Sequence, residues 1–189
     1  TPKPSSAASD VYKRQVIHTM KIICSKSSLL KSVSIALKAV PSKTTMPILE
    51  CILMDATTNQ IKFTTNDMEL GIETIVEGTI EEKGKVALDA KIFYEIIRRL
   101  PDNDVTIKTD DKYAATITCE KAKFNIPGKS GEDFAYLPMI EKDEPLTISQ
   151  YTLKEMIRQT IFSIAVNENN KLMTGEPVSY THLTLPTKA

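Results

Sequence analysis

The sequence predicts an α+β fold in which two helices per domain pack on largely antiparallel sheets, built from repeated β-α-β-β-β units. Three observations predict it. A short apolar strand that ends in a serine or an aspartate occurs three times, at 21–25, 85–89 and 146–149. A segment with helical spacing of its apolar residues follows each strand, and alternating β-rich segments follow the first two helices. The strands start roughly 60 residues apart, a spacing typical of an assembly of similar modules.

Ser25, Asp89 and Ser149 are the predicted N-caps of the three helices, because their side chains can accept a hydrogen bond from the free amides of the first turn. The fourth and eighth residues after each cap are apolar, and residues four apart share one helix face. These six residues are Leu29, Val33, Phe93, Ile97, Leu153 and Ile157. This face is predicted to pack on a sheet.

The remaining elements follow from alternation and from turn-forming residues. The first unit is predicted to contain a strand at 22–24, a helix at 26–40 that Pro41 ends, and strands at 48–54, 61–65 and 70–80. The second unit is predicted to contain a strand at 85–88, a helix at 90–100 that Pro101 ends, and strands at 105–108, 114–119 and 123–126. A third unit begins with a helix at 150–165 after the charged segment 141–145.

Four segments are predicted along the chain. Residues 1–19 and 177–189 lack sustained periodicity and resemble read-through translations of sequencing adapters, so 1–19 is interpreted as a non-native or disordered tail and 177–189 as a non-native tail. Residues 20–140 hold two strand–helix–strand units and are predicted to form one complete domain. Residues 141–176 are predicted to be the start of a second, truncated domain.

Composition excludes several classes of protein. An apolar content of 41% and a charged content of 25% are ordinary for a soluble globular protein. No apolar run approaches the roughly 20 residues that span a bilayer, so no membrane partner is expected. The three cysteines are odd in number and far apart, which favours reduced core residues in a cytoplasmic protein over disulfides.

Catalytic and cofactor-binding patterns are weak. Both histidines, His18 and His182, lie in the tails, which leaves the middle without the residue most used for proton transfer. The segment 128–130 (GKS) has no glycine five residues earlier, so a polar turn is predicted in place of a phosphate loop. Acidic pairs at 67/69, 81/82 and 110/111 could in principle bind Mg²⁺, but solvated turns explain them better. No catalytic residue, metal or cofactor is expected.

The basic residues are more informative about function than the acidic pairs. Residues 20–176 hold 20 basic and 23 acidic residues, a net charge of −3. Each predicted helix nevertheless carries basic residues away from its apolar face, namely Lys31, Lys38, Lys91, Arg98, Arg99, Lys154 and Arg158. A solvated outer face is the ordinary explanation for one such helix. Three repeated basic helices in an acidic protein favour a surface that attracts phosphates without reading sequence.

Several segments resemble one family. These are 45–49 (TMPIL), 64–70 (TTNDMEL) and 132–138 (EDFAYLP), together with 162–165 (FSIA) and 172–175 (LMTG). From residue 20 to residue 176 the chain resembles a bacterial DNA polymerase III β subunit, the replicative sliding clamp. The resemblance implies the DNA-clamp fold, with three similar domains per chain, and a head-to-tail homodimer that forms a ring around duplex DNA.

The resemblance also implies a mechanical function. Such a clamp is a non-catalytic processivity factor that tethers the replicative polymerase, and its partners are duplex DNA, the polymerase III catalytic subunit and the clamp loader. The parent holoenzyme has DNA-directed DNA polymerase and 3'-5' exonuclease activity. By matching position, Lys43 and Asn167 fall where the family contacts DNA. Phe124 and Ile126 match apolar residues of the family's dimer interface, although ordinary core alternation would also explain them.

Two alternatives remain open from the residues alone. One is a small Mg²⁺-dependent nuclease-like enzyme that uses the acidic pairs. The other is a static single-strand-binding module, which would need aromatic stacking platforms. On the clamp interpretation the 189-residue chain alone is expected to form no closed ring.

Overall fold

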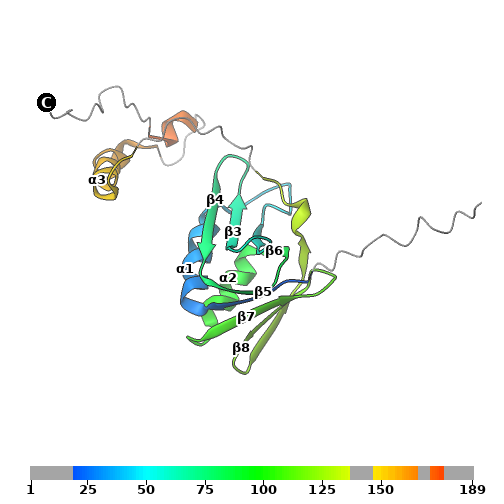
Figure 1. Ribbon diagram of the computed structural model, residues 1–189. Coiled ribbons are helices and arrows are strands. Elements are labelled where there is room, and N and C mark those ends of the chain that lie inside the picture. The colour runs from blue at the N-terminus through cyan, green and yellow to red at the C-terminus, as the bar shows by residue number, and fades with distance from the viewer. Residues whose placement is uncertain (1–18, 137–146, 166–170, 177–189) are drawn as a thin grey trace, which may run out of the picture. The chain divides into compact units, whose positions relative to one another are not determined.

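A computed structural model describes residues 19–136, 147–165 and 171–176 (Figure 1). The chain divides into two compact units, Thr1–Met139 and Ile140–Ala189, which are described separately. The first half of unit 1 contains β1 (Lys21–Ser25), α1 (Lys26–Ala36), a 3-10 turn (Leu37–Ala39), β2 (Cys51–Asp55), β3 (Ile61–Asn66), β4 (Gly71–Val76) and β5 (Gly78–Glu82). The second half contains β6 (Lys85–Asp89), α2 (Ala90–Arg99), β7 (Asp104–Thr109), β8 (Ala115–Cys119), β9 (Ala122–Ile126), β10 (Gly128–Ser130) and a 3-10 turn (Gly131–Asp133).

The two halves of unit 1 exchange strands. One sheet has the order β5-β1-β7-β8-β9 and the other has the order β10-β6-β2-β3-β4, and all the neighbouring strands are antiparallel. Each sheet therefore takes the first and last strands of one half and the middle three strands of the other half. The predicted repeat is thus an internal repeat of the fold, with one helix and five strands in each half. The α+β class with antiparallel sheets is confirmed.

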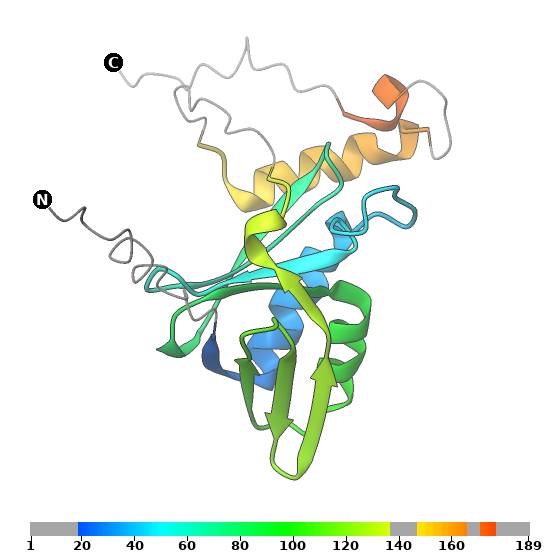
Figure 2. The same ribbon diagram turned by 90° about the vertical axis from the view of Figure 1, so that its right-hand side faces the viewer.

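The helices bring the two sheets together into one core. α1 contacts α2 and packs on β3 and β4, while α2 packs on β2, β6 and β9. Figure 2 shows the two helices against the strands. The four predicted apolar residues of these helices, Leu29, Val33, Phe93 and Ile97, are all 0% exposed. Phe93 meets Phe63 of β3 edge to face, with ring centroids 6.1 Å apart.

The predicted strand at 70–80 is wrong as a single element. It divides at Glu77, because β4 pairs with β3 in one sheet whereas β5 pairs with β1 in the other. Gly78 begins β5, and a Cβ atom there would lie 2.5 Å from both the Ile23 carbonyl oxygen and Cys24 Sγ. This approach is too close for any side chain. A glycine at this position lets the chain cross from one sheet to the other.

The GKS segment is also not the predicted polar turn. Gly128–Ser130 forms the short strand β10, which pairs with β6 in the same way as β5 pairs with β1. A segment of three residues is too short to show the alternation of apolar and polar residues that predicts a strand. The remaining boundaries differ by a few residues: β2 begins at Cys51, after a turn at 47–50, and the α-helical part of the first helix ends at Ala36.

The segment after β10 packs over the outer face of one sheet. Phe134 is 3% exposed and covers a small cluster of Cys51, Leu53 and Ala87. Asn66, at the end of β3, donates a hydrogen bond from its amide to the Ala135 carbonyl oxygen (2.5 Å). The two family-like segments that contain Asn66 and Ala135 are therefore joined by this hydrogen bond.

In unit 2 the described elements are α3 (Gln150–Thr160) and two 3-10 turns (Ile161–Ser163 and Lys171–Thr174). The α-helical part is shorter than the predicted 150–165, since the last residues form a 3-10 turn. The apolar residues Leu153 and Ile157 are 44% and 40% exposed, because no strand covers them among the described residues of this unit. In the part of the chain that the structure describes, no helix is long and apolar enough to cross a membrane.

Candidate nucleic-acid interface

All three predicted helix caps are confirmed. The Ser28 amide donates to Ser25 Oγ (3.2 Å), and the Ile92 amide donates to Asp89 Oδ1 (2.8 Å). The Thr152 amide donates to Ser149 Oγ (3.0 Å). Each cap fixes where its helix starts. The helical positions counted from the caps are therefore equivalent in the three helices.

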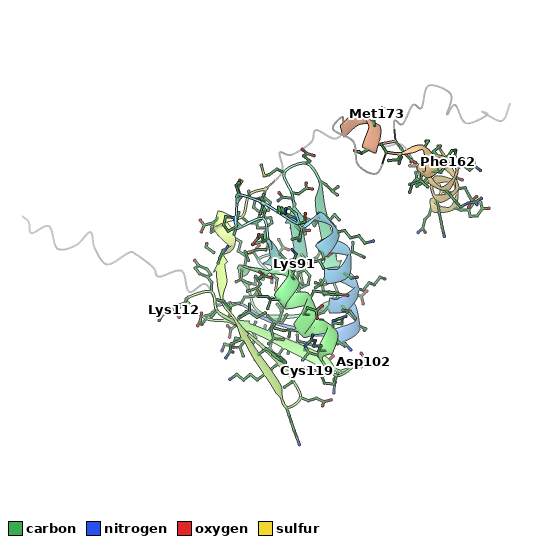
Figure 3. The ribbon with its side chains drawn as sticks, turned by 180° about the vertical axis from the view of Figure 1, so that it is seen from behind. Lys91, Asp102, Lys112, Cys119, Phe162 and Met173 are labelled. Atoms are coloured by element: carbon green, nitrogen blue, oxygen red, sulfur yellow. The ribbon has the colours of Figure 1, made fainter. Side chains whose placement is uncertain are left out.

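Five basic residues of unit 1 lie on the exposed sides of two neighbouring helices or in the 3-10 turn that follows the first of them. α1 and α2 are in contact, and Figure 3 shows them side by side in front of the strands, with Lys91 near the start of α2. Because the opposite sides of both helices are buried, the cations point to solvent. The exposed cations are Lys31, Lys38, Lys91, Arg98 and Arg99. We call these five residues, on the exposed sides of α1, of the 3-10 turn that continues it (Leu37–Ala39) and of α2, the helix wall.

Charge is distributed unevenly over the helix wall. α1 has no acidic residue, and among the described residues Lys31 and Lys38 form no ion pair. In α2, Glu95 Oε2 lies 2.7 Å from Arg98 Nη2 and 3.4 Å from Arg99 Nη2. The wall thus has a net positive charge in a chain whose formal net charge is zero.

The other predicted DNA-contacting residues are placed separately. Lys43 is exposed in the 40–50 connection between α1 and β2. Lys154 and Arg158 are exposed on α3, which belongs to unit 2, and Arg158 pairs with Glu155 (2.7 Å). Asn167 lies outside the described residues. The structure therefore brings the five wall cations together in unit 1, whereas Lys154 and Arg158 belong to unit 2.

The two predicted interface residues have different environments. Phe124 and Ile126 are two apart on β9, so their side chains leave the same side of the strand. Ile126 is 3% exposed and belongs to the main core of unit 1, which makes its side chain a packing residue in this structure. Phe124 is 39% exposed, because it borders a hollow of about 350 Å³ between β9 and α2. The other lining residues of this hollow are Lys91, Ile92, Glu95, Ile96 and Arg99.

The acidic residues at 67/69 and 110/111 lie in turns as predicted, whereas the pair 81/82 lies in β5 and not in a turn. Asp67 Oδ1 accepts hydrogen bonds from the amides of Glu69 (2.9 Å) and Leu70 (2.7 Å). Asp110 Oδ1 does the same for the amides of Lys112 (2.9 Å) and Ala114 (2.8 Å). Glu81 forms an ion pair with Lys21 (2.5 Å). Within the described ranges, no group of three His, Cys, Asp or Glu side chains is arranged to hold a metal ion.

The three cysteines are buried and free. Burial raises the pKa of the Cys24 thiol to about 12, with Asp104 adding to the rise, and burial also raises the pKa values of Cys51 and Cys119. The thiolate is the nucleophilic form, so these side chains are unsuited to nucleophilic catalysis near neutral pH.

We therefore expect thiol reagents to label none of the three cysteines at pH 8 while the protein is folded. All three should react after unfolding in urea, because the thiol pKa values then return to near 8.5. Mass spectrometry after a short pulse of iodoacetamide measures this directly. Labelling of Cys24 at the rate of a free thiol in native buffer would contradict the burial described above.

Two features escaped the sequence prediction. The first is the hollow beside Phe124, which depends on the distance between α2 and β9 and leaves no periodic signal. The second is the set of ion pairs between Glu95 or Glu155 and nearby arginines. Their spacing of three or four residues is visible in the sequence, since residues so spaced meet on a helix surface.

Comparison with known proteins gives a consistent result. Residues 20–138 match the family model described as the DNA polymerase III beta subunit, N-terminal domain. The chain is 37% identical over 164 residues to the beta sliding clamp of Bacillus subtilis (strain 168), an alignment that covers 82% of this chain and 43% of that protein. It is 35% identical over 164 residues to the beta sliding clamp of Synechocystis sp., covering 82% and 42%.

Solved structures agree. A protein from Eubacterium rectale ATCC 33656, assigned as a DNA polymerase III beta subunit, is 68% identical with a TM-score of 0.78, and the match covers 82% of this chain and 43% of that chain. The DNA polymerase sliding clamp of Bacillus subtilis gives 35% identity and a TM-score of 0.75, covering 81% and 42%. The chain therefore spans less than half the length of the relatives that it matches.

Proposed function

Since the chain belongs to the family of the DNA polymerase III β subunit, the bacterial sliding clamp, we propose that it is part of a processivity factor whose helix wall contacts duplex DNA without reading its sequence. The observation that carries this proposal is the helix wall, five exposed cations on two contacting helices and the 3-10 turn after the first, in a chain without net charge. Lysine and arginine side chains attract phosphates of any sequence. Such a contact is loose enough for a protein to slide along DNA.

The exchanged strands support assembly into a ring. The two edge strands β4 and β9 occupy equivalent positions in the two halves of unit 1, and neither has a second partner strand among the described residues. The other two edges are less able to pair, because β5 carries Glu81 and Glu82 and β10 has only three residues. A domain with two equivalent open edges can join a neighbour on each side. Such contacts close into a ring when the rotation from one domain to the next adds up to a full turn.

The hollow beside β9 supports one of these contacts. Phe124 is 39% exposed and Ile92 is 51% exposed, so an apolar side chain from a neighbouring domain could pack between them. In this proposal β9 faces a second subunit in a head-to-tail homodimer. The polymerase III catalytic subunit and the clamp loader are the proposed partners of the complete ring.

The proposed role is mechanical and not catalytic. The acidic residues that a Mg²⁺-dependent nuclease would need are engaged in turns at Asp67 and Asp110, and Glu81 is paired with Lys21. The proposal therefore assigns no catalytic residue and no cofactor to this chain.

Binding to short DNA duplexes tests the proposed contact. We expect fluorescence anisotropy to give similar affinities for duplexes of unrelated sequence. The affinity should fall with salt, with a slope of log K against log[salt] of about −4 if four or five wall cations each neutralise a phosphate. Chelation of divalent metal should leave binding unchanged, and no strand cleavage should occur. A sequence-dependent affinity, or cleavage that requires Mg²⁺, would contradict the proposal.

A further inference from the structure

A carboxylate and an arginine occur at the same two positions of α2 and α3. Counted from the caps Asp89 and Ser149, the sixth residue is Glu95 in α2 and Glu155 in α3, and the ninth is Arg98 or Arg158. α1 differs, since Lys31 and Ser34 hold these positions after Ser25. Two of the three basic helices, α2 and α3, therefore carry a carboxylate next to an arginine, and α1 does not.

In both helices the carboxylate contacts the guanidinium group of the arginine three residues later. Glu95 Oε2 lies 2.7 Å from Arg98 Nη2, and Glu155 Oε2 lies 2.7 Å from Arg158 Nη2. Arg158 also donates from Nε to both carboxylate oxygens of Glu155 (3.2 Å each). The arginine side chains are 52% and 68% exposed, so phosphates can reach them. Glu95 additionally reaches Arg99 at 3.4 Å.

Such a pair has a small structural effect and a larger electrostatic one. An exposed ion pair three residues apart on a helix adds little to the stability of the fold. A phosphate that binds the arginine, however, must compete with a carboxylate already in contact with the guanidinium group. The carboxylate also lowers the local positive charge by one. Both effects weaken the attraction of the helix for DNA.

We propose that Glu95 and Glu155 are positioning residues that restrain Arg98 and Arg158 and so limit how tightly the helices bind duplex DNA. This inference rests on the proposed function, because it concerns the strength of the same DNA contact. A clamp must stay on DNA and still move along it. The unrestrained side chains of Lys31 and Lys38 supply attraction, while the restrained arginines keep the total contact weak.

The test replaces both carboxylates by amides in the 189-residue chain. In the variant Glu95→Gln/Glu155→Gln the arginines lose their charged partners and become available to phosphates. The slope of log K against log[salt] for a DNA duplex should steepen by about 0.9 for each released arginine, which corresponds to roughly eightfold tighter binding per arginine at 0.1 M salt. Fluorescence anisotropy between about 20 mM and 200 mM salt measures both quantities.

A matched control removes two carboxylates elsewhere. Glu73 pairs with Lys62 (3.0 Å) and Glu132 pairs with Lys85 (2.8 Å), and neither lies on a helix of the basic surface. The control Glu73→Gln/Glu132→Gln changes the net charge equally and should leave the slope unchanged. Glu95→Asp keeps the charge but shortens the side chain, so it should give a smaller increase in affinity than Glu95→Gln.

The outcomes separate this inference from the proposed function. If the unsubstituted chain binds with the expected slope and Glu95→Gln/Glu155→Gln binds identically, the restraint is wrong while the DNA contact stands. If the control variant tightens binding as much, overall charge explains the effect and the restraint is also wrong. If neither the unsubstituted chain nor the variant binds a duplex at about 20 mM salt, the proposed DNA contact fails, and the restraint fails with it.

Discussion

The double substitution Lys31→Glu/Arg98→Glu should nearly abolish the binding of this chain to duplex DNA. The two residues lie on different helices of the wall, and both are exposed. The loss of the Lys31 phosphate contact alone lowers the affinity about eightfold at 0.1 M salt. The two introduced carboxylates repel phosphates and weaken binding further. Fluorescence anisotropy on a duplex of arbitrary sequence measures the loss.

The fold should tolerate this double substitution. Lys31 forms no ion pair within the described ranges, and Arg98 takes part only in an exposed contact with Glu95 (2.7 Å). Placing a glutamate at 98 brings like charges together at three-residue spacing, which costs a few tenths of a kcal/mol. Circular dichroism and the urea midpoint should therefore be almost unchanged.

A control with equal charge change locates the effect. Lys108 lies on β7 and Lys112 in the turn before β8, and Figure 3 shows Lys112 away from the helix that carries Lys91. Lys108→Glu/Lys112→Glu should retain most of the affinity, since neither residue belongs to the helix wall. Equal weakening by both double substitutions would show that total charge, and not the helix wall, governs DNA binding.

The substitution Phe93→Ala should have the largest effect on stability. The side chain is 0% exposed, lies four residues after the α2 cap, and packs edge to face on Phe63. Removing a buried phenylalanine side chain loses apolar burial and leaves a cavity, which together cost about 3–5 kcal/mol. Domains of this size have a free energy of unfolding of about 5–15 kcal/mol, so a large fraction of the stability of unit 1 should be lost.

Urea unfolding followed by circular dichroism measures this change. The midpoint should fall markedly while the slope m stays nearly constant, because the folded state buries about the same surface. Phe124→Ala is the matched control, since the same side chain is 39% exposed on β9. It should cost less than about 1 kcal/mol. Similar losses for both variants would mean that the pair of helices does not organise the core.

The parts of the fold that the sequence predicts best are those with local signals. Ser25, Asp89 and Ser149 act as caps because hydrogen bonds within four residues define a helix start. The burial of Leu29 and Phe93 follows from helical spacing. The exchange of strands between the two halves has no local signal. Glu77 lies inside an alternating run, and only pairing with two different sheets reveals that the strand divides there.

The same distinction applies to the candidate site. The exposure of Lys31 and Arg98 could be predicted, because a buried apolar face determines which side of a helix is solvated. The difference between Phe124 and Ile126 could not be predicted. Both residues leave the same side of β9, yet Ile126 is 3% exposed in the core and Phe124 is 39% exposed beside the hollow. Strand alternation alone gives the two side chains the same environment, so the difference has no signal in the sequence.

Mapping by NMR of the backbone amides that respond to an unspecific DNA duplex tests the central claim most directly. The account predicts that the largest shifts fall in α1, α2 and α3 and around Lys43, and that they are the same for duplexes of unrelated sequence. The backbone amides of the β-strands in both sheets should show little change. Shifts concentrated on those strands, or responses that depend on the base sequence, would contradict a clamp whose helices face the DNA backbone.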